Sequence, residues 1–270
     1  MIVCVLGMHK SGTTVVAETL HRSGIDMGVF DERLGYDEGN QYERHEAIDL
    51  NRGLLSAASI PTLLGARAGR MERNRAGYQP NADAHSIVRR RKLARVLANA
   101  DLGPFRRLAE GLSADHRDWG FKDPRTCLTY DVWRRALPEH RVVAVYRPFE
   151  EVLTHFKVKW TSPWLMTRQI HSWIVHNEML IDHLRRRADF VLLRYDDLMN
   201  GPDEFARMAA YLGRSLEDCR KPDMYRSRAQ RVGDRPKAPF VIPRRVIDRV
   251  AGIENDLADL RNAMSVPTVG

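Results

Sequence analysis

The stretch that decides the fold is MIVCVLGMHKSGTT, residues 1–14. Its first seven residues are apolar, partly β-branched and end in glycine, which predicts a buried strand. Residues 12–23 then carry apolar side chains at helical spacing, and Gly24 is a typical stop for that helix. Gly7 and Gly12 are separated by four residues, which is the spacing of a phosphate-binding loop between a strand and a helix.

The position of the lysine distinguishes this loop from that of nucleotide hydrolases. Consecutive backbone N–H groups must point at one anion, a task that favours glycine, and the N-terminus of the following helix adds partial positive charge. In nucleotide hydrolases the lysine directly follows the second glycine. Here that position is Thr13, and the lysine lies inside the loop as Lys10.

The remainder of the chain alternates between short apolar segments and helical patterns. We expect further strands at residues 119–122, 141–146 and 190–193, and a helix opened by Pro148. Other helices are expected over residues 43–58, 83–100, 105–112, 127–137, 163–187 and 203–212. Alternation of this kind predicts an α/β fold in which helices flank a central parallel sheet.

The chain length suits one domain. We expect a single domain over residues 1–270, with a helical insertion at about residues 60–118. Residues 26–42 and 60–82 lack periodicity and are expected to be loops, and the tail from residue 221 is basic and interrupted by prolines. No apolar run approaches the ~18 residues of a membrane span. Because the N-terminus also lacks the pattern of a secretory signal, we expect a cytoplasmic protein.

The charge and the cysteines exclude few of the possible functions. The net charge of +8 indicates an anionic partner, and it leaves open nucleic acid, an anionic nucleotide or an acidic acceptor. The cysteines are odd in number, far apart and without metal-binding spacing: Cys4, Cys127 and Cys219. We expect them to be buried or incidental thiols in a reducing compartment.

The order Lys-Ser-Gly-Thr-Thr at the end of a first strand resembles the 5′-phosphosulfate loop of sulfotransferases that use 3′-phosphoadenosine 5′-phosphosulfate. The resemblance implies the P-loop-NTPase-like sulfotransferase fold, and it implies that this nucleotide is the cofactor. Lys10 is then expected to stabilise charge on the bridging and sulfuryl oxygens. The loop residues expected to bind the cofactor are His9, Lys10, Ser11, Gly12, Thr13 and Thr14.

Later segments resemble the same family. Arg147 follows the strand 141–146, where the family places the arginine that binds the 3′-phosphate. The family serine eight residues further on is replaced by His155, with Thr154 before it, and either side chain could donate to the phosphate. In many members a basic C-terminal loop closes the cofactor pocket, which makes Arg228 a candidate for that contact.

Two further segments carry the candidates for substrate binding and for the base. Lys122-Asp123-Pro124-Arg125 resembles a block of bacterial sulfotransferases, and Lys122 and Arg125 are expected to bind substrate. Transfer to an alcohol needs a general base near the acceptor hydroxyl. Residues 39–43, GNQYE, resemble an Asn–aromatic–Glu segment of the bacterial branches, so Glu43 is the expected base and His45 the alternative. Trp160 and Trp164 could stack on an acceptor ring or lie in the core.

Three functions are compatible with these residues. The leading hypothesis is sulfuryl transfer to a hydroxyl, or to an amine, of a small-molecule or glycan acceptor, without a metal, because the sulfuryl group carries one formal negative charge. The alternative is a P-loop kinase of a small molecule that uses ATP–Mg²⁺, with Asp196 as the substitute for the missing metal ligand after strand 141–146. The third is a basic nucleic-acid or glycan-binding domain. No nucleic-acid partner is expected, because no nucleic-acid-binding module is recognisable. The sequence indicates no acceptor and no oligomeric state.

Overall fold

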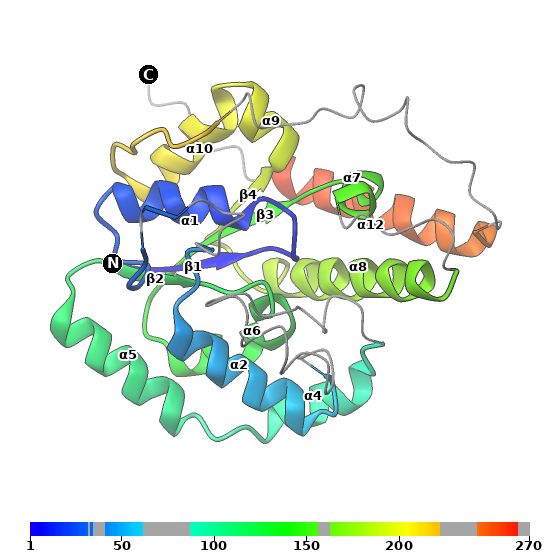
Figure 1. Cartoon of the computed structure of the whole chain (residues 1–270), viewed down its shortest axis with the longest axis horizontal. Coiled ribbons are helices and arrows are strands. Elements are labelled where there is room, and N and C mark those ends of the chain that lie inside the picture. The colour runs from blue at the N-terminus through cyan, green and yellow to red at the C-terminus, as the bar shows by residue number, and fades with distance from the viewer. Residues whose placement is uncertain (32, 35–40, 62–86, 156–162, 222–241, 264–270) are drawn as a thin grey trace.

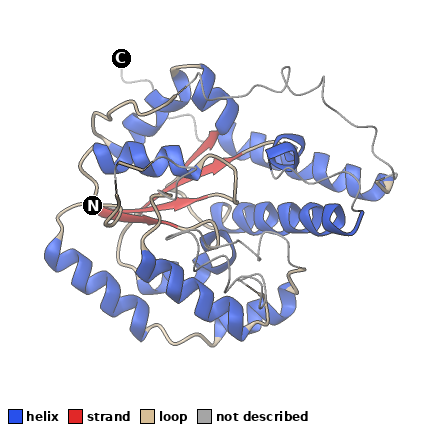
Figure 2. Ribbon diagram, in the orientation of Figure 1, coloured by secondary structure: helices blue, strands red, loops and turns tan. Residues whose placement is uncertain are grey.

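The computed structural model describes residues 1–31, 33–34, 41–61, 87–155, 163–221 and 242–263, without the side chains of residues 154–155 and 163–165. The described residues form one sheet of four parallel strands between two layers of helices (Figure 1 and Figure 2), which confirms the expected α/β fold. The strands are β1 (Ile2–Leu6), β2 (Trp119–Lys122), β3 (Arg141–Tyr146) and β4 (Val191–Arg194). Their spatial order is β2-β1-β3-β4, so β1 is an interior strand.

Helices cover both faces of the sheet. One face carries α1 (Thr13–Arg22), α9 (Tyr195–Asn200) and α10 (Asp203–Leu212). The opposite face carries α2 (His45–Ala57), α4 (Arg90–Ala98), α5 (Gly103–Asp115), α6 (Thr126–Ala136) and α8 (Pro163–Leu184) (Figure 1). The short α7 (Phe149–His155) and the C-terminal α12 (Arg244–Ala263) pack against α8.

The strand β1 shows why both faces are buried. Side chains alternate along a strand, so Ile2, Cys4 and Leu6 join the core under α6 and α8, whereas Val3 and Val5 join the core under α1 and α10. All five are apolar and buried. Parallel strands covered on both faces are typically continuous apolar runs of this kind.

The expected strands are confirmed to within one residue, and one helix prediction is wrong at its start. The helix expected over residues 83–100 begins only at Arg90, and residues 87–89 are not helical. The basic tail, for which the sequence predicts no helix, contains the 20-residue α12 directly after Pro243. Only Val250, Ile253 and Leu257 of α12 are buried, because the helix contributes a narrow apolar stripe to the core and exposes its many charges.

The described part of the expected insertion shares the main core. Leu93 and Leu97 of α4 and Phe105 of α5 belong to the same apolar cluster as Trp133 of α6. Residues 62–86 lie outside the described residues. The three cysteines are free and buried, as expected. In the described part of the chain, no helix is long and apolar enough to cross a membrane.

We expect Gly120→Ala to destabilise the fold. A Cβ at this position of β2 would lie 2.5 Å from the carbonyl oxygen of Val3 and 2.9 Å from the sulfur of Met27, so the free energy of unfolding should fall by about 1–3 kcal/mol. Gly111→Ala is the matched control, because Gly111 is exposed in α5 and no described atom lies within 4 Å of an added Cβ. The control should gain up to about 1 kcal/mol. Urea unfolding measures both, and a stable Gly120→Ala variant would contradict the close approach of these strands.

Candidate active site

The carboxyl ends of all four strands meet at one edge of the sheet, which is where open parallel sheets bind ligands. The loop from Gly7 to Gly12 follows β1, and Lys122 is the last residue of β2. Arg147 directly follows β3, and Tyr195 directly follows β4. The parallel order therefore brings together side chains that are distant in the sequence.

Glycine is required at both ends of the loop. A Cβ on Gly7 would lie 2.6 Å from the carbonyl oxygen of Val145, and a Cβ on Gly12 would overlap the ring of Tyr195. Gly12 has a φ of 96° and Lys10 a φ of 67°, and left-handed residues of this kind turn successive N–H groups into one concavity. A lysine in that region costs about 1–3 kcal/mol, so the surrounding contacts must hold the loop in this shape.

The loop has the chemistry of an anion site. Helix α1 begins at Thr13, and its first turn holds no acidic residue and no side-chain cap, so the positive end of the helix dipole faces the loop. Ser11 is buried, and among the described residues no group hydrogen-bonds to its hydroxyl oxygen. A buried hydroxyl without a partner is costly. These residues therefore fit a phosphate group, which would accept the hydrogen bond that Ser11 lacks.

Arg147 lies against this loop. Its guanidinium stacks 4.5 Å from the centre of the Tyr195 ring, its Nη1 lies 3.5 Å from the carbonyl oxygen of Lys10, and its Nε donates to Glu151 at 3.0 Å. Burial and the neighbouring carboxyl of Asp196 raise the pKa of Glu151 to about 7, against the opposing charge of Arg147. The loop and the residues after β3 and β4 thus form one contiguous site.

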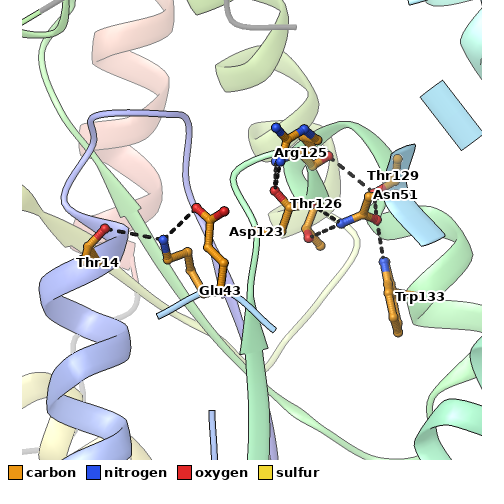
Figure 3. Close-up of polar contacts among 9 residues, drawn as sticks. Thr14, Glu43, Asn51, Asp123, Arg125, Thr126, Thr129 and Trp133 are labelled. Atoms are coloured by element: carbon orange, nitrogen blue, oxygen red, sulfur yellow. Dashed lines mark hydrogen bonds and ion pairs between the residues drawn. The ribbon is translucent and has the colours of Figure 1, made fainter. Parts of the chain in front are cut away.

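Lys122 joins the loop to the expected base (Figure 3). Its Nζ lies 2.9 Å from Oε1 of Glu43 and 3.3 Å from Oγ1 of Thr14. Lys122 is fully buried, whereas the Glu43 side chain keeps 17% of its surface exposed. Burial alone would raise the pKa of Glu43, but the charges of Lys122, Arg125 and His9 outweigh burial and lower it.

Backbone strain directs Glu43 to this position. The preceding residue, Tyr42, has a left-handed φ of 50° and is buried. Its ring packs 4.9 Å from the centre of Phe30 and 5.8 Å from the centre of His21. A bulky residue in that backbone region costs about 1–3 kcal/mol, so this aromatic packing must hold the turn that presents Glu43 to Lys122.

Three other expected site residues have different surroundings. His45 begins α2 and is exposed. Arg125 is fully buried and pairs with Asp123 at 2.8 Å. His9 is buried and meets His176 of α8 edge to face at 6.2 Å. The side chains of Thr154, His155 and Trp164 are not among those that the structure describes, and Trp160 and Arg228 lie wholly outside the described residues.

The sequence did not identify two contributors to the site. Tyr195 contacts both Gly12 and Arg147. Glu254 of α12 accepts a hydrogen bond at 2.9 Å from the N–H of Phe149, two residues after Arg147. No local signal marks Glu254, because its partner is 105 residues away. Among the described residues, no group of three or more His, Cys, Asp or Glu is placed to hold a metal ion.

Comparison with known proteins gives a family and a fold. A model of the sulfotransferase family matches residues 3–218. The structure of the sulfotransferase STF1 of Mycobacterium tuberculosis H37Rv is similar, with a TM-score of 0.52 at 17% identity, over 93% of this chain and 76% of that chain. The sulfotransferase domain of the Synechococcus PCC 7002 olefin synthase has a TM-score of 0.51 at 15% identity, over 94% of each chain. The expected sulfotransferase fold is therefore confirmed. A search of curated proteins finds no match.

We expect Glu151→Gln to remove a pH dependence of stability. The pKa of Glu151 is about 7 in the folded protein against an ordinary value of 4.5, so folding favours the protonated form and wild-type stability falls as the pH rises from 4.5 to 7. Glutamine cannot ionise. The free energy of unfolding of the variant should therefore rise relative to that of wild type across this window, by on the order of 2 kcal/mol. Urea unfolding at pH 5, 6, 7 and 8 measures the difference. The exposed neighbour gives the control, Glu150→Gln, whose curve should run parallel to wild type. If the curves of stability against pH for both variants run parallel to that of wild type, the pKa of Glu151 is not raised in the folded protein.

Proposed function

The chain belongs to the sulfotransferase family, and we propose that it moves a sulfuryl group from 3′-phosphoadenosine 5′-phosphosulfate to a hydroxyl, or to an amine, of a small-molecule or carbohydrate acceptor. The observation that carries the proposal is the bridge that Lys122 makes between Thr14, at the start of α1, and Glu43. It supports the proposal because Lys122 then contacts both a residue proposed to bind the donor and the residue proposed as the base. A cytoplasmic location stays a prediction.

The loop supplies the donor site in this proposal. Ser11, Thr13 and Thr14 bind the 5′-phosphate together with loop N–H groups, and Arg147 binds the 3′-phosphate. The buried hydroxyl of Ser11 and the positive end of α1 support the first assignment. The contact of Arg147 with the loop supports the second. Lys10 stabilises the negative charge that develops on the oxygen between phosphorus and sulfur.

Glu43 and Lys122 act on the acceptor side. The acceptor oxygen forms a bond to sulfur, the bond from sulfur to the 5′-phosphate oxygen breaks, and Glu43 takes the acceptor proton. The product is 3′,5′-adenosine bisphosphate. Because Lys122 lowers the pKa of Glu43, the carboxylate is ionised and ready to accept a proton at neutral pH. The same ammonium group lies close enough to Thr14 to stabilise charge on the transferred group.

We expect the protein to bind 3′,5′-adenosine bisphosphate in calorimetry with EDTA present, and to bind it more tightly than ATP–Mg²⁺. Lys10→Ala should weaken binding by about 10- to 100-fold, since a charge-assisted hydrogen bond contributes about 1.5–3 kcal/mol. Lys92→Ala is the control, because Lys92 hydrogen-bonds to Ser59 on the exposed surface. Tighter binding of ATP–Mg²⁺ would favour the kinase alternative. Binding that survives Lys10→Ala but falls steeply with salt would favour a diffuse polyanion surface.

Ser11→Ala separates binding from stability. The variant deletes a buried hydroxyl that has no partner among the described residues, so stability should hold or rise by about 1 kcal/mol. Affinity for 3′,5′-adenosine bisphosphate should fall by about 5- to 20-fold. In the control Ser23→Ala, the lost hydroxyl donates to Thr19 and accepts from Glu217, so stability should fall while affinity stays unchanged. Equal affinity of Ser11→Ala and wild type would remove Ser11 from the phosphate site.

A further inference from the structure

Asn51 lies at the centre of a buried polar network on the helix that follows Glu43. It is fully buried in α2, and its Nδ2 donates to Oδ2 of Asp123 at 2.8 Å and to Oγ1 of Thr126 at 3.0 Å (Figure 3). Its Oδ1 accepts from Oγ1 of Thr129 at 2.6 Å and from Nε1 of Trp133 at 2.8 Å. An amide has two donor hydrogens and two lone pairs on its oxygen, so every one of these is used.

The partners of Asn51 belong to the corner that also fixes Lys122. Asp123 directly follows Lys122, and its Oδ1 accepts from the backbone N–H and from Nη1 of Arg125. Both carboxylate oxygens of Asp123 therefore have partners, one on α2 and one at the start of α6. The network joins α2 to the end of β2 and to α6. If one of its groups moves, a buried polar atom loses its partner, and this costs about 1–3 kcal/mol for each group.

A second contact anchors the beginning of the same helix. Arg44, which precedes α2, is buried and donates from its Nε to the carbonyl oxygen of Gly120 in β2 at 3.2 Å. Asn51 lies seven residues further along, or roughly 10 Å at the rise of an α-helix. The contact of Arg44 fixes where α2 begins. The hydrogen bonds of Asn51 add a second polar contact two turns away, which restrains the rotation of the helix about its axis.

We propose that Asn51 is a positioning residue for the Glu43–Lys122 pair: its four hydrogen bonds set the rotation of α2 against the β2–α6 corner and so hold the Glu43 carboxylate beside the Lys122 ammonium. The catalytic importance of this role rests on the proposed function of Glu43 as the base. A displacement of about 1 Å at a reacting group can cost about 100-fold in rate, so a side chain remote from the acceptor can still control the base.

The test measures the pKa of Glu43 by NMR titration of ¹³C-labelled glutamate carboxyls, with the signal assigned by its loss in Glu43→Gln. The groups that act on Glu43 are Lys122, Arg125 and His9. If α2 rotates in Asn51→Leu, Glu43 moves away from Lys122 while it stays largely buried, so its pKa should rise. Thr129→Val removes a single hydrogen bond to Asn51 and should raise the pKa by a smaller amount.

Tyr130→Phe is the matched control on the same helix. Tyr130 is buried in α6 and bonds to His140 and Arg187, not to Asn51, so its loss should lower stability without changing the pKa of Glu43. An unchanged pKa in Asn51→Leu would show that the contact of Arg44 and the packing of Tyr42 position the base without Asn51, and it would overturn the proposal. If Asn51→Leu does not fold, an unchanged pKa in Thr129→Val overturns it.

The same samples separate this inference from the proposed function. Titration with 3′,5′-adenosine bisphosphate should give an unchanged affinity in Thr129→Val, because the hydroxyl of Thr129 bonds to Asn51 and lies 3.3 Å from the carbonyl oxygen of Arg125, away from the proposed phosphate contacts. A wild-type protein that fails to bind this nucleotide would contradict the proposed function. The positioning role of Asn51 would still be decided separately, by the pKa of Glu43 in the variants and in wild type.

Discussion

The parallel pairing of β1 with β2 on one side and with β3 on the other brings distant parts of the sequence to one edge of the sheet. Because each strand runs in the same direction, its last residue and the turn after it lie at that edge. The tight packing at Gly7 against Val145 and at Gly12 against Tyr195 leaves no space for a side chain at either end of the loop that follows β1. Every contact of the candidate site depends on this arrangement.

Three buried cations follow or end the strands β2 and β3 at this edge of the sheet, and each has a carboxylate partner. Lys122 pairs with Glu43, Arg125 with Asp123, and Arg147 with Glu151. Buried ion pairs are weak sources of stability, because desolvation offsets most of their attraction. Their position at one edge of the sheet is consistent with the anionic nucleotide proposed as the ligand. The carboxylates of these pairs have different surroundings. Asp123 also accepts a hydrogen bond from Asn51, whereas the side chain of Glu43 remains partly exposed.

The sequence predicted the strands well and the site only in part. Continuous apolar runs and a glycine-bounded turn are local signals, so β1 and its loop could be located directly. The contact between Lys122 and Glu43 spans 79 residues, and nothing in the spacing indicates it, although both residues were selected by resemblance. Asn51 resembles any polar residue of an amphipathic helix, and α12 has too few apolar positions to stand out among its charges. Packing in three dimensions determines the roles of these residues.

A crystal structure of the protein with 3′,5′-adenosine bisphosphate tests the central claim most directly. We expect a 5′-phosphate oxygen within hydrogen-bonding distance, about 3 Å, of the hydroxyl of Ser11, with the 3′-phosphate beside Arg147. A nucleotide bound away from residues 7–14, or bound there with its 5′-phosphate directed out of the loop, would contradict it.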